Sequence, residues 1–363
     1  MNTAQNRPRA SIILIAYNEE RIIEQAIQSA CKQTAQAIEI VCVDDGSADA
    51  TYERMRKCAA CDSRIKIVHQ PNGGTLAARC AGIRQATGVY SLFLDADDLL
   101  SPDAVQTACD AADEQGADVL EFGVQLTGDA SNPAVVEAMR VLKAYQIAFT
   151  EKPPLPDPPY GPALVNACYA EGIISWCLWN KVYRTELLQS AVRFFEGERL
   201  TLGEDQLITL MILCSAKHYA RIGTKLYTYT VGAGISSERI PFASVEAAKK
   251  GAGIWTPVKL AHEWLDKAGY PQDPIADGMT AYVKALRGYA VQYLNERCPA
   301  EYRPAFLEEL SYRSTKEEFS EIICDAMELL DRRYRLISES TCWKMTKPIR
   351  RILDMVKGAV KES

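Results

Sequence analysis

Along residues 11–124, segments with the apolar pattern of a strand alternate with segments that have the apolar pattern of a helix. This alternation restricts the possible folds more than any other feature of the 363-residue chain. Short apolar runs, typical of buried strands, are separated by stretches in which apolar residues recur every three or four positions, typical of helices. Strands are expected at 11–16, 38–43, 65–69, 90–94 and 119–124. Because such strands need crossover connections, the pattern predicts an α/β fold with a mostly parallel, twisted sheet covered on both faces.

Polar clusters follow four of the expected strands. They lie at residues 17–19, 44–47, 71–74 and 95–98. In open parallel sheets ligands bind outside the carboxyl ends of the strands, so four clusters along that edge predict a binding site. Asn18, in the first cluster, is also expected to cap the helix that follows.

The fourth cluster is the most acidic, with Asp95, Asp97 and Asp98 directly after the apolar run 90–94. Carboxylates at the end of a buried strand repel one another and lose hydration, so a bound cation would offset the cost. Because Mg²⁺ and Mn²⁺ prefer oxygen ligands, the segment predicts a site for a divalent cation with a diphosphate. Helix capping is the alternative, since Ser-Pro-Asp at 101–103 is typical of a helix start.

Composition excludes several classes of protein. A net charge of −6 argues against nucleic-acid binding, and no apolar run reaches the roughly 18–20 residues of a membrane span. The first ten residues lack the apolar core of a signal peptide. The 12 cysteines are scattered through apolar stretches, as buried free thiols are in a reducing compartment. Cys58 and Cys61 have no second pair at zinc-like spacing, so we expect a cytoplasmic protein without a zinc site.

The second half of the chain has a different organisation. The proline-rich segment 153–159 cannot form a helix or a central strand, so a surface loop or flap is expected there. Buried structure resumes at 173–179 and 187–195, and an apolar helix is expected at 206–216. A helical pattern then covers 244–338, with a break at Pro271 and Pro274. We therefore expect three parts, at 1–240, 241–338 and 339–363.

The order and spacing of six motifs over residues 10–240 resemble those of family 2 glycosyltransferases with the GT-A fold, of the kind that build bacterial surface polysaccharides. The motifs are SIILIAYNEE (11–20), VDDGS (43–47), NGGTLAAR (72–79), LDADD (94–98), WNKVYR (179–184) and ED (204–205). Residues 340–350 resemble a C-terminal signature of some of these enzymes. The resemblance implies a GT-A nucleotide-binding domain, followed here by the helical subdomain and the tail.

The resemblance also implies how a nucleotide-linked sugar, most often linked to uridine diphosphate, would be bound. Asp45 would accept a hydrogen bond from uracil, Tyr17 would stack near the base, and Glu19 would lie beside the base or ribose. Asp95 would lie near the ribose, and Arg79 would help to place the donor. The same motifs assign further donor contacts to Ala16, Asn72, Gly74 and Ala96. Relatives often have asparagine after this arginine, but Cys80 stands here, so no polar contact is expected from it.

Transfer of the sugar makes two chemical demands. The departing diphosphate gains charge, and Asp97 would bind Mn²⁺ or Mg²⁺ that bridges its phosphates and acts as a Lewis acid. The incoming hydroxyl loses a proton, and Asp205 resembles the general base that takes it in inverting members. The resemblance thus implies an inverting hexosyltransferase that extends a surface glycan or a lipid-linked oligosaccharide.

Each of these residues also has a structural interpretation. Asp45 suits a turn, Arg79 could form an exposed ion pair, and Glu204 and Asp205 could cap the following helix. Four residues are secondary candidates for contacts with acceptor or phosphate, namely Trp179, Lys181, Glu204 and His218. Trp179, like Trp176, could stack on an acceptor or belong to the core, Lys181 could contact phosphate or pair with Glu204, and His218 could be a metal ligand or structural.

Two other functions remain as alternatives. A sugar-1-phosphate nucleotidyltransferase would need a glycine-rich loop with a basic residue after the first strand, where this chain has the acidic segment 16–19. A non-catalytic nucleotide-sugar-binding scaffold would not need its acids, yet Asp95, Asp97 and Asp205 are all present.

The C-terminal segment 343–363 carries six basic and two acidic residues, a net charge of +4. Pro348 can start a helix with one apolar face, formed by Ile349, Ile352, Leu353, Val356 and Val360. A basic amphipathic helix of this kind can lie on an anionic membrane surface, which predicts a protein on the inner face of the cell membrane. Packing of this helix on its own chain, or on a partner in a homo-oligomer, is the alternative.

Overall fold

The computed structural model describes most of the chain. It covers residues 7–133, 135–137, 139–140, 154–157, 159–195, 200, 202–232 and 241–338, with side chains to residue 332. The predicted tail helix at 343–363 and the C-terminal signature at 340–350 lie outside the described residues, as does much of the proline-rich segment.

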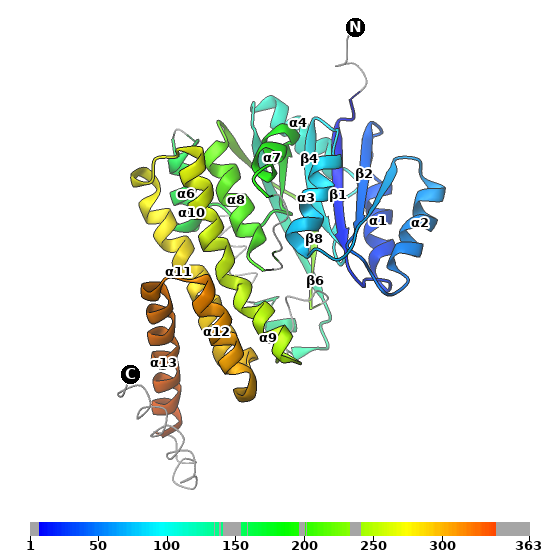
Figure 1. Cartoon of the computed structure of the whole chain (residues 1–363). Coiled ribbons are helices and arrows are strands. Elements are labelled where there is room, and N and C mark those ends of the chain that lie inside the picture. The colour runs from blue at the N-terminus through cyan, green and yellow to red at the C-terminus, as the bar shows by residue number, and fades with distance from the viewer. Residues whose placement is uncertain are drawn as a thin grey trace.

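The described strands form one eight-stranded sheet in the order β3-β2-β1-β4-β7-β6-β8-β5 (Figure 1). The strands are β1 Ala10–Ala16, β2 Ile38–Asp44, β3 Ile65–His69, β4 Tyr90–Asp95, β5 Leu99–Leu100, β6 Val119–Gly128, β7 Lys181–Arg184 and β8 Tyr219–Val231. The pairs β3/β2, β2/β1, β1/β4 and β6/β8 are parallel. The pairs β4/β7, β6/β7 and β5/β8 are antiparallel. The five predicted strands are confirmed, whereas β5, β7 and β8 were not assigned from sequence.

Helices cover both faces of this sheet. In the first part of the chain they are α1 Ile23–Cys31, α2 Thr51–Cys61, α3 Thr75–Gln85, α4 Ala104–Glu114, α6 Pro162–Tyr169, α7 Thr185–Val192 and α8 Glu204–Ser215. Alternate residues of a strand point to opposite faces, so Ile12 and Leu92 pack in one core cluster with α1 and α4. Ile13 and Phe93 pack in the other with α3, α7 and α8. The strands are therefore apolar on both sides, as the parallel arrangement requires.

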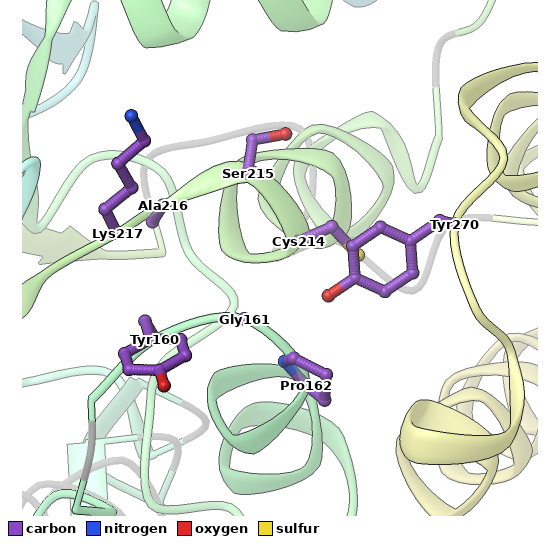
Figure 2. Close-up of a pocket in the computed structure, with 8 residues that line it drawn as sticks. All are labelled: Tyr160, Gly161, Pro162, Cys214, Ser215, Ala216, Lys217 and Tyr270. Atoms are coloured by element: carbon purple, nitrogen blue, oxygen red, sulfur yellow. The ribbon is translucent and has the colours of Figure 1, made fainter.

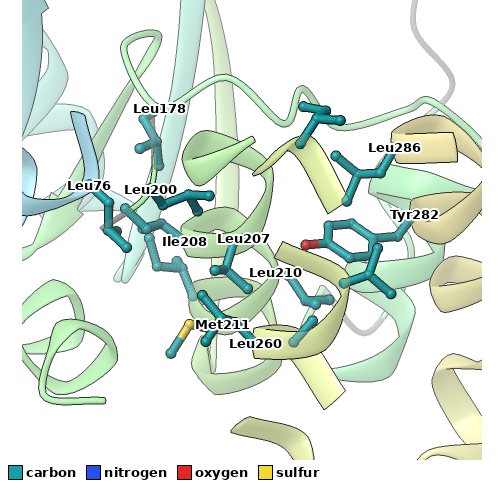
Figure 3. Close-up of a cluster of buried hydrophobic side chains, with 14 of the residues drawn as sticks. Leu76, Leu178, Leu200, Leu207, Ile208, Leu210, Met211, Leu260, Tyr282 and Leu286 are labelled. Carbon is teal, nitrogen blue, oxygen red and sulfur yellow. The ribbon is translucent and has the colours of Figure 1, made fainter. Parts of the chain in front are cut away.

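Residues 241–338 are helical, as predicted. The elements are α9 Val245–Ala252, η3 Gly253–Trp255, α10 Thr256–Ala268, η4 Asp273–Ile275, α11 Ala276–Gln292, η5 Tyr293–Arg297, η6 Ala300–Tyr302, α12 Arg303–Arg313 and α13 Lys316–Ser338. Leu207 and Leu210 of α8 lie in one cluster with Leu260 of α10 and with Tyr282 and Leu286 of α11 (Figure 3). The helical part thus shares a core with the sheet domain, and the three-part division remains a prediction.

Two expectations about local chemistry can be compared with the structure. Asn18 does not cap α1, which starts at Ile23 without a side-chain cap. Asn18 instead has a left-handed φ of 58°, and its Oδ1 accepts a hydrogen bond from the backbone N–H of Ala48, 2.8 Å away. It therefore joins the loop after β1 to the loop after β2. Among the described residues every cysteine is a free thiol, as predicted. No described helix has both the length and the apolarity needed to cross a membrane.

Candidate active site

The carboxyl ends of three parallel strands bring the first two clusters and the fourth together. In the register of the sheet Ala16 lies opposite Asp44, and Ile15 lies opposite Asp95. Tyr17 directly follows β1 and is 41% exposed, so part of an aromatic residue is accessible at this edge. The predicted edge is therefore correct, because parallel strands end at the same side of a sheet.

Asp45 is buried and organises the loop that follows β3. Its Oδ1 accepts hydrogen bonds from Gln70 Nε2 at 2.7 Å and from the N–H of Gly73 at 2.9 Å. Its Oδ2 accepts one from the N–H of Gly74, also at 2.9 Å. A carboxylate has about four lone-pair positions, so Oδ2 keeps the capacity for one further donor. Asp45 thus stabilises a turn and still suits recognition of an N–H group.

Gly46 allows the two loops to come this close. Its φ is +74°, which favours glycine, and a Cβ at this position would lie 2.7 Å from the backbone nitrogen of Asn72. The loops that carry Asp45, Asn72 and Gly74 therefore form one surface beside Tyr17.

The acidic loop after β4 is anchored by its last carboxylate. Asp98 is fully buried, and its two oxygens accept hydrogen bonds from the Tyr227 hydroxyl at 2.8 Å and the Thr230 N–H at 2.7 Å. The same tyrosine hydroxyl accepts a hydrogen bond from the N–H of Asp95, 3.1 Å away. Burial raises the pKa of Asp98 to about 8, and the charges of Asp97 and Asp95 add to this effect. Asp98 therefore holds the loop in place from the inside.

Asp97 and Glu19 face the same region from different strands. Burial raises the pKa of Asp97 to about 6, and Asp95 adds to the shift. Burial also raises the pKa of Glu19 to about 7, with Asp97 and Asp49 as the further causes. Within the described ranges, no basic side chain is among the causes of either pKa shift. The negative charge of these two carboxyl groups therefore has no described positive side chain to balance it. Glu19 therefore lies close enough to Asp97 for the two charges to interact, and its place beside the base or ribose stays a prediction.

This donor set fits a divalent cation that also binds a diphosphate. Within the described part of the chain, no group of three or more histidine, cysteine, aspartate or glutamate side chains is arranged to hold a metal by itself. Mg²⁺ is commonly held by one or two carboxylates, with substrate phosphates and water as the remaining ligands. Asp97 and the uncompensated charge around it match that coordination.

Arg79 connects the acidic loop to the second half of the chain. It is only 4% exposed, so the interpretation as an exposed ion pair is wrong. Its guanidinium lies 3.4 Å from Asp95, 3.6 Å from Glu204 and 3.3 Å from Asp205. Burial opposes the charge of Arg79, but the three carboxylates outweigh burial and raise its pKa. Residues from α3, β4 and α8 thus converge on one positive charge.

The contacts of this cluster are long for charge-assisted hydrogen bonds. The buried Nε of Arg79 and the buried Oδ1 of Asp205 have no hydrogen-bond partner within the described residues. Catalytic hydrogen bonds are often long in ligand-free enzymes and shorten when the substrate is bound. Burial, followed by the charge of Asp205, raises the pKa of Glu204 well above its usual range. The cluster therefore has unused hydrogen-bonding capacity at the residue predicted to be the base.

Aromatic rings form a wall beside the acidic loop. Trp179 stacks on Tyr227 with ring centroids 4.8 Å apart and on Tyr229 with centroids 5.2 Å apart. All of Tyr227 is buried, whereas Trp179 and Tyr229 are partly exposed. Tyr227 and Tyr229 were not predicted from the sequence. Residues two positions apart in a strand lie on the same face of the sheet, so their spacing could have indicated that they lie together.

Two secondary candidates lie elsewhere. Lys181 is 1% exposed, and its Nζ donates hydrogen bonds to the Cys177 carbonyl at 2.6 Å and to Asn180 Oδ1 at 2.9 Å. This geometry gives Lys181 a structural role in place of the phosphate contact. His218 precedes β8, and its carbonyl accepts the N–H of Asp118 at the start of β6. Because β6 runs parallel to β4, His218 lies at the opposite edge of the sheet from Asp97, and the metal-ligand assignment is wrong.

A hollow of about 490 Å³ also lies at that opposite edge. Tyr160, Pro162, Lys217 and Tyr270 line it, at the start of α6 and after the ends of α8 and α10 (Figure 2). It is therefore separate from the acidic cluster.

Comparison with known proteins gives the class to which this sheet domain with its acidic edge belongs. Residues 11–166 match the family model described as glycosyl transferase family 2. The chain is 33% identical over 225 residues to EpsJ of Bacillus subtilis, an uncharacterized glycosyltransferase, with 61% of each chain covered. The family model thus identifies a glycosyl transferase family 2 domain at residues 11–166. The chain spans about three fifths of the length of that curated relative.

Solved structures share the fold. TarS of S. aureus matches over 85% of this chain and 50% of its own, with 21% identity and a TM-score of 0.56. A structure of TarS residues 1–349 in complex with UDP-GlcNAc matches over 84% of this chain and 91% of its own, with 22% identity and a TM-score of 0.51. At this identity the likeness concerns the fold.

Proposed function

We propose that this chain is an inverting, metal-dependent glycosyltransferase that moves a sugar from a nucleotide diphosphate sugar, with uridine as the nucleoside, to a growing cell-surface glycan or lipid-linked acceptor. The observation that carries the proposal is the convergence of Asp95 and Asp205 on the buried Arg79, next to the uncompensated carboxylate of Asp97. Residues distant in sequence thus form one constellation that sugar transfer can use.

The donor side is the surface formed by the loops after β1, β2 and β3. The partly exposed ring of Tyr17 suits stacking on a base, and the remaining acceptor capacity of Asp45 suits an imide N–H such as that of uracil. Ala16, Asn72 and Gly74 lie in the same strand ends and loops, and Ala96 lies in the acidic loop after β4. The shared fold with TarS, whose 1–349 structure contains UDP-GlcNAc, supports this class of donor.

Asp97, with Glu19 nearby, would hold Mn²⁺ or Mg²⁺, which when bound supplies positive charge for the leaving diphosphate. Asp205 would take the proton of the acceptor hydroxyl. The new bond joins the acceptor oxygen to the anomeric carbon while the bond from that carbon to the diphosphate breaks, and the nucleoside diphosphate leaves. A single displacement of this kind inverts the anomeric centre. Arg79, 3.3 Å from Asp205, orients that carboxylate.

The two alternatives are less well supported. A nucleotidyltransferase needs positive charge after the first strand, where Tyr17 and Glu19 stand. A scaffold without activity would have no use for the buried Oδ1 of Asp205, which is 3.3 Å from the Arg79 guanidinium and accepts no hydrogen bond from the described part of the chain. At the level of the cell, the predicted basic segment 343–363 would hold the enzyme on the inner face of the membrane, where lipid-linked acceptors are found.

The proposal is tested with purified protein, UDP-linked sugars and MnCl₂. A true donor should raise the melting temperature by mass action, and slow release of UDP should stop when EDTA is added. Asp97→Asn should remove the metal-dependent part of the shift, whereas Asp103→Asn, an acid outside the cluster, should not. Lack of any metal-dependent shift or UDP release across the panel of UDP-linked sugars would refute the proposal.

A further inference from the structure

The loop of residues 173–180, which contains Trp176 and Trp179, has neither helix nor strand structure and lies between the acidic edge and α8. We propose that this loop is the binding wall for the acceptor sugar, and that Glu121, buried beneath it, is the positioning residue that sets its shape. The inference rests on the proposed function, which it extends to the acceptor side.

Glu121 lies in β6 and is 1% exposed. Its Oε1 accepts hydrogen bonds from the Ser175 N–H and from Asn180 Nδ2, both at 3.3 Å. Its Oε2 accepts hydrogen bonds from the Tyr219 hydroxyl at 2.9 Å and from Arg221 Nε at 3.0 Å. A buried carboxylate is costly unless its oxygens are satisfied, so these four donors are held near their present positions. Two of the four belong to the loop.

Two cations, the buried Lys181 and the partly buried Arg221, extend this attachment. Arg221 Nη2 donates a hydrogen bond to the Ile173 carbonyl at 2.6 Å, and Lys181 Nζ donates one to the Cys177 carbonyl at 2.6 Å. The loop is therefore fixed by its backbone at Ile173, Ser175 and Cys177. An irregular segment that cannot form its own backbone hydrogen bonds obtains them here from a charged network beneath it.

The position of the loop points to the acceptor. The Trp176 carbonyl accepts a hydrogen bond from Thr209 Oγ1 at 2.8 Å, and Thr209 lies one helical turn after Asp205 on α8. At its other end Trp179 stacks on Tyr227, whose hydroxyl contacts the acidic loop. The loop thus contacts the helix that carries the predicted base directly, and it is connected to the acidic loop that carries the predicted metal ligand through Tyr227.

The side chains of the loop suit a sugar. Trp176 and Trp179 are both partly exposed, and an aromatic ring with an open face can pack against the apolar face of a pyranose. An acceptor hydroxyl must be placed near Asp205 with little error, because a misplacement of about 1 Å can lower the rate about 100-fold. A wall held by buried charges can supply that accuracy, whereas a mobile loop cannot.

The test compares two buried glutamates. Glu39 is 3% exposed and is bonded by Ser11, Thr87 and Lys66 on the β1 and β2 side of the sheet, away from the loop. Glu121→Gln and Glu39→Gln therefore both remove a buried charge, but only the first affects the loop. Transfer is measured with UDP-N-acetylglucosamine and related UDP-linked sugars as donors and with methyl β-glucoside, methyl β-galactoside and methyl N-acetyl-β-glucosaminide as acceptors.

Glu121→Gln should raise the acceptor KM at least tenfold while the donor dissociation constant stays within twofold. Glu39→Gln should change neither, although both substitutions lower the melting temperature. Trp179→Ala should reproduce the rise in acceptor KM without removing a buried charge. If Glu121→Gln does not fold, Arg221→Lys, which keeps the charge but cannot reproduce the two contacts of the guanidinium, takes its place with the same expected change.

An acceptor KM that is unchanged in Glu121→Gln and in Trp179→Ala overturns the inference, as does an equal rise in Glu39→Gln. Failure of the proposed function is recognised separately, because the unsubstituted protein would then release no UDP. In that case quenching of tryptophan fluorescence by the same methyl glycosides measures binding directly. Quenching that is equal in the unsubstituted protein and in Glu121→Gln also overturns the inference.

Discussion

At the scale of single residues, Arg79 carries one positive charge against the carboxylates of Asp95, Glu204 and Asp205. A cation–π contact also stabilises this charge, since the guanidinium lies 5.3 Å from the centroid of the Phe93 ring. An excess of partly buried acids over bases is costly for folding, but it leaves hydrogen-bonding capacity for a substrate. Such an excess of like charge is one of the features by which active sites shift pKa values.

Asp205→Asn should abolish transfer while leaving donor binding intact. Asparagine has nearly the same shape, so the surroundings of Arg79 are preserved, but it cannot accept the proton of an acceptor hydroxyl. We expect kcat for transfer to fall by about 10²–10⁴-fold, the usual contribution of a general base. Donor titration by calorimetry provides the control. A variant that transfers sugar within a few-fold of the unsubstituted rate would show that another group is the base.

Glu39→Gln should change how stability depends on pH. Burial alone would raise the pKa of Glu39, but hydrogen bonds from Lys66, Ser11 and Thr87 outweigh it and lower the pKa. A depressed folded-state pKa contributes stability above the unfolded value of about 4.5, and this contribution is lost as the pH falls through the folded value. We expect a loss of about 1–3 kcal/mol at pH 7. Urea denaturation should show a smaller difference between the two proteins at pH 3, and an equal difference would contradict the linkage.

At the scale of elements, α8 determines where the predicted base lies. Gly203 directly precedes the helix and has a left-handed φ of +77°. The first turn of the helix then carries Glu204 and Asp205 toward Arg79. Residues 206–214 of α8 are buried on all sides of the helix. The helix therefore packs within the core, against α6, α7 and α10.

Gly203→Ala should destabilise the fold and lower activity together. A Cβ there would lie 2.9 Å from Pro257 Cγ, and alanine would be strained at this φ. We expect a loss of about 1–3 kcal/mol in unfolding free energy. Gly288→Ala, inside α11 and with no atom within 4 Å of the new Cβ, is the matched control. It should be neutral or stabilising by up to about 1 kcal/mol. Equal effects of both substitutions in urea denaturation would contradict this account of α8.

At the scale of the whole molecule, the helical part and the sheet domain share one core. α10 and α11 cover α8 and α6, so the elements after residue 241 stabilise the helix that carries Asp205. Helices distant from the chemistry in sequence therefore determine its geometry.

Removal of residues 339–363 should separate membrane binding from catalysis. The net charge of +4 in 343–363 predicts attraction to anionic lipid of about 1 kcal/mol per basic residue near the surface, reduced by salt. The full chain should co-sediment with phosphatidylserine vesicles at low salt, and the shortened chain should not, whereas the UDP-sugar dissociation constant should be equal in both. Neutral phosphatidylcholine vesicles are the control. Equal sedimentation of the two chains would exclude the tail as a membrane anchor.

The sequence by itself determined the strand and helix periods of residues 11–124 and the edge at which Tyr17, Asp45 and Asp97 lie. These features are local, because hydrophobic periodicity identifies each element and parallel strands end at a common edge. Only the tertiary structure decided that β7 lies between β4 and β6, which puts His218 at the far edge and buries Lys181. It also decided that Glu121 lies under the tryptophan loop and that three carboxylates meet at Arg79. Strand order and helix packing join segments distant along the chain, and the free energy that selects those contacts comes from burial in a common core, which no local pattern records.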